Sequence, residues 1–358
     1  MKKAIVLLII VVILPVFTLS ASADDGVDGY ISDFENLLPE GFEGVSEDTD
    51  GLIERADIRS LFTEIISVIA DGGGEVMSFF LRLLGSCILL CAAGLVQERF
   101  ARQTEAAVGI ICSLLVFDSL GSLFVTVEQA LGQISDFFSA LIPLVVGITA
   151  LGGSTATAGV QASGMYTALS VVGNVGTRLF LGISAFGLAM GLLSALGNEG
   201  ISSVSKGVKE LFTKITGIFT ALLTAAYSLQ TIISSAADSA AMRATKYAAS
   251  GLIPIVGTTV AGAISTLAAG LSYAKGVIGG GGIIVIIYMA LAPLTLMLLY
   301  RLALSVVMIF ASFTRSGGAV RIFTSYRFAL DMTITVYSLS ALVYLFLIIV
   351  FVIRVDLI

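Results

Sequence analysis

The chain has 358 residues, of which 57% are apolar and 12% charged, about half the charged share of an ordinary soluble domain. This composition excludes a soluble enzyme, and the absence of histidine excludes a His-dependent triad and a His-ligated metal site. The net charge of -6 is unevenly spread, because residues 24–75 carry fifteen acidic side chains and two arginines. We therefore expect an all-α, polytopic membrane protein with an acidic N-terminal segment and with no catalytic, cofactor-binding or metal-binding residues.

The first 23 residues have the order of a cleavable signal peptide. Lys2 and Lys3 precede an apolar stretch that runs to Leu19, and small residues come before the first acidic pair. A charged start, an apolar middle and a small-residue end are typical of export signals, so cleavage is expected after Ala23. The alternative is an uncleaved first membrane helix. In both cases the following segment lies outside the cytoplasm.

Residues 24–75 form the predicted acidic extracytoplasmic segment. Its first part, 24–51, has few large apolar side chains and cannot bury enough surface to offset chain entropy, so we expect a mobile arm. Residues 52–70 place apolar and charged side chains on opposite faces, which predicts an amphipathic helix. Its acidic balance favours docking on the protein's own membrane domain or on a partner over anionic lipid. The glycine-rich run 71–75 is expected to end this helix.

A polytopic transmembrane domain with about seven to nine spans is predicted for residues 76–358, since a span needs about 20 largely apolar residues. The candidate spans are 76–96, 106–127, 137–152, 179–197, 215–237, 251–271, 283–312 and 328–353. Residues 153–178 are rich in small side chains and are expected to form a re-entrant or discontinuous helix. The span 283–312 contains a proline and is expected to be a kinked helix or two packed pieces.

Charges between the spans predict a partial topology. The two arginines of 97–105 place that loop in the cytoplasm by the positive-inside rule. The acidic segment 128–136 has no lysine or arginine and is expected to form a loop outside. The arginines within 315–327 indicate a second cytoplasmic loop before the last helix.

An internal repeat is suggested by residues 141–159, which align without a gap on 252–270 with nine of nineteen positions identical. If the repeat is real, prolines break paired helices at equivalent places, and paired interrupted helices point to a permeation or binding site. The alternative is two unrelated helices that share a proline kink. The candidate helix-break and permeation positions are Pro143, Pro254, Gly257 and Pro293.

Glycine spacing adds two expectations. Gly187 and Gly191, and likewise Gly276 and Gly280, have the small-x-x-x-small spacing that favours close helix approach. The run Gly279–Gly282 is expected to be a hinge rather than a phosphate cradle, since no Gly-Lys-Ser/Thr sequence follows it.

Arg82 and Asp118 are the candidates for an intramembrane ion pair. By the helical rise, Arg82 lies about 9 Å below the outer edge of the first span and Asp118 about 13 Å below that of the second. Pairing is expected because it lowers the cost of burying either charge. Both a structural staple between neighbouring helices and a water-lined path remain open. Arg178 and Asp331 lie nearer predicted helix ends and are expected to snorkel.

A polar helix end within 226–259 leads through the basic step Arg243, Lys246 and Tyr247 to an Ile-Pro-Ile-Val-Gly sequence. This segment resembles the middle of the stage III sporulation protein AE family. The apolar stretch 276–312 and the layout of export signal, acidic exported segment and polytopic domain are also similar.

The resemblance implies a part in endospore formation, as a non-enzymatic membrane core of the channel or secretion-like complex that sustains late forespore gene expression. It implies residence in the mother-cell membrane around the forespore. The implied partners are the other stage III sporulation A-operon membrane proteins and, directly or indirectly, stage II sporulation protein Q, with no nucleic acid and no cofactor. The alternative is a stand-alone secondary transporter or permease for a small solute, although few buried acids are available to bind a coupling ion.

Overall fold

The computed structural model describes residues 28–38, 58–94, 101–151, 154–176, 257–313 and 317–353, with single positions between 178 and 243. Within these residues every regular element is a helix and none is a strand, which confirms the all-α fold class. Four of the described helices contain stretches long and apolar enough to cross a membrane, which fits a multi-pass membrane protein. These stretches are Ile65–Ala92, Ala107–Leu151, Gly276–Phe313 and Gly318–Phe351. The signal peptide 1–23 lies outside the described residues.

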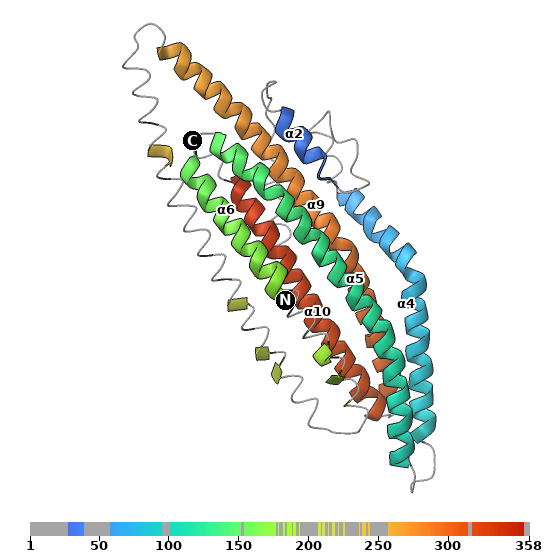
Figure 1. Ribbon diagram of the computed structural model, residues 1–358. Helices are drawn as coiled ribbons and strands as arrows, with labels where there is room; N and C mark the ends of the chain where they lie inside the picture. Colours follow the sequence, from blue (N-terminus) through green and yellow to red (C-terminus); the bar gives the residue numbers. More distant parts are fainter. Residues whose placement is uncertain are drawn as a thin grey trace.

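The four long helices are α4 (Ile58–Gly94), α5 (Ala101–Leu151), α9 (Gly257–Phe313) and α10 (Gly317–Ile353). Figure 1 shows them side by side in an elongated bundle, with α4 and α9 ending and α5 and α10 beginning at the lower end of the view. At about 1.5 Å per residue, α5 extends about 77 Å and α9 about 86 Å. These lengths exceed twice the roughly 30 Å hydrocarbon core, a difference that a tilt of up to about 40° does not absorb.

α4 joins two predicted elements in one helix. The predicted break at 71–75 between the amphipathic helix and the first span is wrong, since α4 continues through it. A Cβ atom at Gly72 would lie 2.9 Å from Leu296 Cδ1 of α9. Glycine costs roughly 1 kcal/mol relative to alanine in a helix, and here its small size lets the two helices pack closely.

The expected mobile arm contains a docked helix, α2 (Asp28–Glu35), which packs against α5 and α9 (Figure 1). Phe34 is fully buried in the core of the bundle, and Ile31, Leu37 and Leu38 pack partly against it. The prediction of mobility is therefore wrong for residues 28–38. Four apolar side chains in this short stretch bury enough surface to hold it on the membrane domain.

α5 runs through a predicted loop and a predicted break. The segment 128–136 is helical rather than a loop, because Val127, Leu131 and Ile134 continue a buried apolar face at helical spacing. Pro143 does not break α5, which ends at Leu151. A proline inside a helix costs about 3 kcal/mol, and the buried side chains on both sides of it outweigh that cost.

α9 is likewise continuous, so the reading of 283–312 as two packed pieces is wrong even though Pro293 lies inside the helix. The predicted hinge at Gly279–Gly282 is also part of the helix. A Cβ atom at Gly282 would lie 3.1 Å from Leu141 Cδ2 of α5 and 3.5 Å from Ile348 Cδ1 of α10. The absence of a side chain at Gly282 therefore serves close packing of three helices.

The two segments of the suggested repeat differ in their backbone. The first covers the end of α5 and the start of α6 (Thr155–Leu169). The second, from Gly257 onward, lies in uninterrupted α9, and Pro254 lies outside the described residues. The helix boundaries therefore do not follow the suggested repeat, because the first segment contains a helix end and the described part of the second does not. The weakly apolar segment 153–178 contains α6 followed by a π-helical stretch, η2 (Ser170–Gly176).

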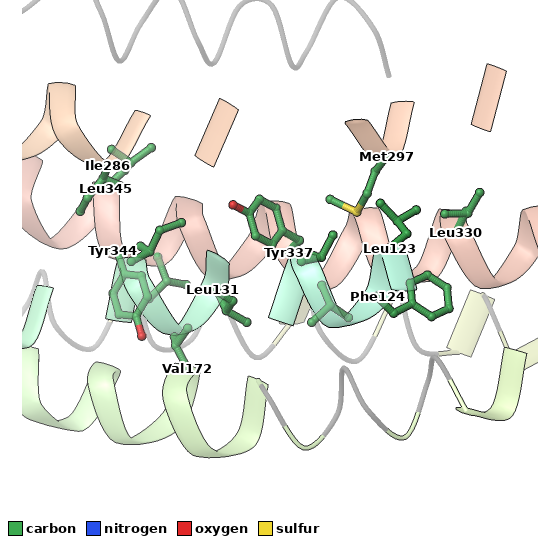
Figure 2. Packing of buried hydrophobic residues seen from close by; sticks show 14 of the residues in the cluster. Leu123, Phe124, Leu131, Val172, Ile286, Met297, Leu330, Tyr337, Tyr344 and Leu345 are labelled. Atoms are coloured by element: carbon green, nitrogen blue, oxygen red, sulfur yellow. The ribbon is translucent and has the colours of Figure 1, made fainter. Parts of the chain in front are cut away.

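Among the described residues, α10 supplies five of the eight largest fully buried aromatic side chains. Figure 2 shows Tyr337 and Tyr344 among apolar side chains of α5, α9 and η2. The Tyr344 hydroxyl lies 3.0 Å from Ser135 Oγ of α5, and the Tyr326 hydroxyl donates a 2.7 Å hydrogen bond to the Ser113 carbonyl of α5. Buried tyrosines need such partners, and these bonds fix α10 lengthwise against α5.

Candidate functional site

Each of the four long helices carries one charged residue at the same level of the bundle. α4 carries Arg82, α5 carries Asp118, α9 carries Arg301 and α10 carries Asp331. They lie ten to thirteen residues, or about 15 to 20 Å, from the lower ends of their apolar stretches. In a hydrocarbon core of about 30 Å this is close to the middle. We call these four residues the charged layer.

The predicted pair of Arg82 and Asp118 is brought together between α4 and α5. Arg82 Nη1 lies 3.9 Å from Asp118 Oδ2, at the outer limit of an ion pair, and donates a 3.1 Å hydrogen bond to Ser119 Oγ. The Arg82 side chain is 50% exposed and that of Asp118 84% exposed. Their pair therefore lies on the surface of the bundle and is loose.

The second pair of the layer was missed by sequence reasoning. Arg301 Nε lies 2.5 Å from Asp331 Oδ1, with side chains 38% and 14% exposed. The expectation that Asp331 snorkels is therefore wrong, since its carboxylate is held inside the bundle between α9 and α10. No signal in the sequence indicated this pair, because Arg301 lies fourteen residues before the predicted cytoplasmic loop at 315–327 and Asp331 only four residues after it.

An aromatic contact connects the two pairs. The rings of Phe79 on α4 and Tyr300 on α9 have centroids 4.6 Å apart. Tyr300 precedes Arg301, and Phe79 lies one turn before Arg82. The contact therefore fixes α4 and α9 at the same depth, which aligns the two pairs of the charged layer.

The start of α6 holds a polar site that sequence reasoning also missed. Asp238 is buried, and its carboxylate accepts a 3.1 Å hydrogen bond from the Ala156 N–H and a 2.6 Å hydrogen bond from the Thr157 N–H. The first N–H groups of a helix lack partners within the helix and attract negative charge. Ser154 at the N-cap makes no side-chain cap, so a residue far along the chain supplies it.

Two polar side chains on α6 are buried close to this cap. Among the described residues, Thr157 Oγ1 and both amide atoms of Gln161 have no hydrogen-bond partner, and Gln161 is 0% exposed. The two residues lie four apart and so share one face of α6. An unpaired buried polar group costs about 1 to 3 kcal/mol, so its presence in a native fold needs an explanation other than packing. We call Thr157, Gln161 and Asp238 the α6 polar cluster.

None of the remaining predicted positions that the structure describes belongs to the charged layer. Pro143 is exposed on α5, Pro293 is buried in α9, and Gly257 is the first residue of α9. Arg243 is an exposed helical position, whereas Lys246, Tyr247 and Pro254 lie outside the described residues. Within the described part of the chain, no cluster of three or more His, Cys, Asp or Glu side chains has the arrangement of a metal site.

Comparison with known proteins matches the full length of this bundle. The family model described as stage III sporulation protein AE covers residues 56–355, which include all four long helices. The stage III sporulation protein AE of Bacillus subtilis (strain 168) is 20% identical over 291 residues, which are 77% of this chain and 72% of that protein. No solved structure matches the chain. The chain therefore belongs to the stage III sporulation protein AE family and is a sporulation protein.

Proposed function

We propose that the chain is a non-enzymatic membrane core component of the channel or secretion-like complex that links mother cell and forespore. It acts in the mother-cell membrane around the forespore, where the complex sustains late forespore gene expression. Its proposed partners are the other stage III sporulation A-operon membrane proteins and, directly or indirectly, stage II sporulation protein Q. Family membership supports the sporulation role, and the four membrane-crossing helices support a multi-pass component.

The charged layer is the observation that carries the proposal of a membrane core. A charged side chain at the bilayer centre costs about 2.5 to 3.5 kcal/mol on insertion scales, and a simple anchor gains nothing from it. This chain maintains two charges of each sign at one depth, and one of the two pairs is exposed on the surface of the bundle. Such charges suit contact with other membrane proteins or with a water-lined path.

The length of the bundle supports contact with partners beyond the bilayer. α5 and α9 extend past the hydrocarbon core on the side where α2 and α6 lie (Figure 1). In the orientation predicted from an exported N-terminus, that side is the space between the two membranes.

A clean deletion in an endospore-forming host tests the proposal. We expect engulfment to be completed and a late forespore reporter to be silent, with expression restored by the intact gene. A copy with Arg82→Leu and Asp118→Leu should accumulate in the membrane yet fail to restore the reporter. A copy with Arg178→Leu, an exposed arginine outside the charged layer, should restore it. Normal late transcription in the deletion strain would refute the assignment.

Reconstitution separates this proposal from the transporter alternative. Co-purification with the sporulation A-operon proteins supports a complex component. Solute uptake by the purified chain alone in liposomes supports a stand-alone transporter instead.

A further inference from the structure

The outward face of α4 and α5 at the charged layer is apolar but carries two charges. Leu81 and Ile88 of α4 and Leu114 of α5 are each more than half exposed. Arg82 and Asp118 lie among them with side chains 50% and 84% exposed. We call these five residues the α4–α5 face.

The α4–α5 face is poorly suited to lipid. Hydrocarbon offers no hydrogen-bond donors or acceptors, so polar groups at this depth must be satisfied by protein. Arg82 has a partner in Ser119 as well as a distant one in Asp118. The Asp118 carboxylate has most of its surface uncovered while its nearest guanidinium nitrogen is 3.9 Å away. The face therefore calls for a protein partner that brings a cation or donor to Asp118.

Small side chains surround the two charges and permit close approach. Ser78 and Gly85 on α4 and Ser122 on α5 are exposed within one turn of Arg82 or Asp118. A Cβ atom at Gly85 or Gly121 would meet nothing within 4 Å in this chain. In membranes, helix association relies on small residues that let backbones approach and on polar side chains that bond across the interface.

The charge pattern of the face is complementary to itself. Copies of one chain share their orientation in the membrane, so a two-fold axis between them runs along the membrane normal and pairs residues of equal depth. Arg82 and Asp118 are in contact and so have equal depth, and they carry opposite charges. A two-fold rotation therefore brings Arg82 of each copy to Asp118 of the other. A partner that carried only positive or only negative charge would pair with just one of these two residues.

We propose that the α4–α5 face binds a second copy of this chain within the membrane, through two reciprocal pairs between Arg82 and Asp118. The interface is isologous, with each copy contributing the same patch. This dimer is a property of the chain alone and goes beyond the proposed role in a larger complex.

Disulfide cross-linking in native membranes tests the dimer. The full-length chain, with its three cysteines replaced by alanine, carries either Ser122→Cys on the α4–α5 face or Leu302→Cys on α9. Leu302 is 60% exposed and follows Arg301, so it has the same depth and serves as the matched control. With an oxidant we expect Ser122→Cys to yield a product of twice the mass of the uncross-linked chain and Leu302→Cys to remain monomeric. Overturning results are no product, equal products at both positions, or a product whose mass indicates a different protein.

Charge reversal between copies tests the reciprocal pairs. Arg82→Asp makes the face doubly negative and Asp118→Arg makes it doubly positive, so each variant alone should lose most of the Ser122→Cys product. Co-expression of the two variants should restore it, because opposite faces then meet. An ion pair confined to one chain predicts no rescue, so a mixture no better than the single variants overturns the proposal. If either variant fails to accumulate in the membrane, the cross-linking of the chain with unaltered charges decides the question.

Discussion

The exposure of each residue in the charged layer determines the free-energy cost of keeping its charge within the membrane. Asp331 is 14% exposed and pairs with Arg301, so its charge is held inside the bundle. Asp118 is 84% exposed and its surroundings are set by whatever covers the α4–α5 face. An arginine–aspartate pair therefore has two roles in this bundle. Arg301 and Asp331 join α9 to α10 inside it, whereas Arg82 and Asp118 face outward on α4 and α5.

Replacing either Arg301 or Asp331 alone should destabilise the protein more than replacing both. Arg301→Leu leaves a buried carboxylate without its cation, and Asp331→Leu leaves the cation without its carboxylate, each costing about 3 kcal/mol or more. The double variant buries two apolar side chains and should recover much of that loss. The midpoint of thermal unfolding is measured for each of the three variants, purified in mild detergent. A double variant as unstable as the sum of the singles would show that the two residues act independently.

The predictability of the site differs residue by residue. Arg82 and Asp118 can be paired from sequence because both fall in the first two spans, whose ends are marked by charged segments. Arg301 falls in a stretch too long for one crossing, so its depth has no reference point in the sequence. The cap by Asp238 joins residues more than eighty positions apart, and no local pattern encodes it.

Within the long helices, glycines and prolines that usually end a helix do not end it. Glycines at 71–75 and 279–282 and prolines at 143 and 293 all lie inside continuous helices. A glycine costs roughly 1 kcal/mol and a proline about 3, whereas the apolar side chains buried on both sides of these positions contribute more by packing on neighbouring helices. The sequence therefore predicts helical class and apolar content correctly but divides the long helices in the wrong places.

The close approach predicted at Gly276 and Gly280 is wrong within this chain, since a Cβ atom at either position would meet nothing within 4 Å. The close approach predicted at Gly187 can be tested with a matched glycine pair. A Cβ atom at Gly187 would collide with Ala329 of α10, at 2.9 Å from its Cα atom, whereas one at Gly182 would meet nothing within 4 Å. Gly187→Ala should destabilise the protein by about 1 to 3 kcal/mol through overpacking. Gly182→Ala should be neutral or stabilising by up to about 1 kcal/mol, since alanine favours the helix. The unfolding midpoints of the Gly187→Ala and Gly182→Ala variants are compared in detergent. Equal midpoints would contradict close packing at Gly187.

The whole bundle is longer than a membrane is thick, and the exposed surface of α5 shows where the bilayer ends. Its large exposed side chains between 110 and 125 are apolar, including Ile111 and Leu114. Between 126 and 136 its exposed side chains are polar, namely Thr126, Gln129, Gln133 and Asp136. The change falls about 12 Å above Asp118, close to the half-thickness of about 15 Å of a hydrocarbon core centred on the charged layer.

Thiol accessibility along α5 tests this placement of the bilayer. In a cysteine-free chain expressed in intact protoplasts, Gln133→Cys should react with a membrane-impermeant maleimide added outside. Leu114→Cys, which is 52% exposed on the same helix, should stay unlabelled because it lies within the membrane, where the maleimide does not reach it. Labelling of Gln133→Cys only after the membrane is opened would invert the predicted orientation while keeping α5 longer than the bilayer. Protection of Gln133→Cys under both conditions would instead place the upper half of α5 in lipid or against protein, and the charged layer would then no longer mark the centre of the membrane.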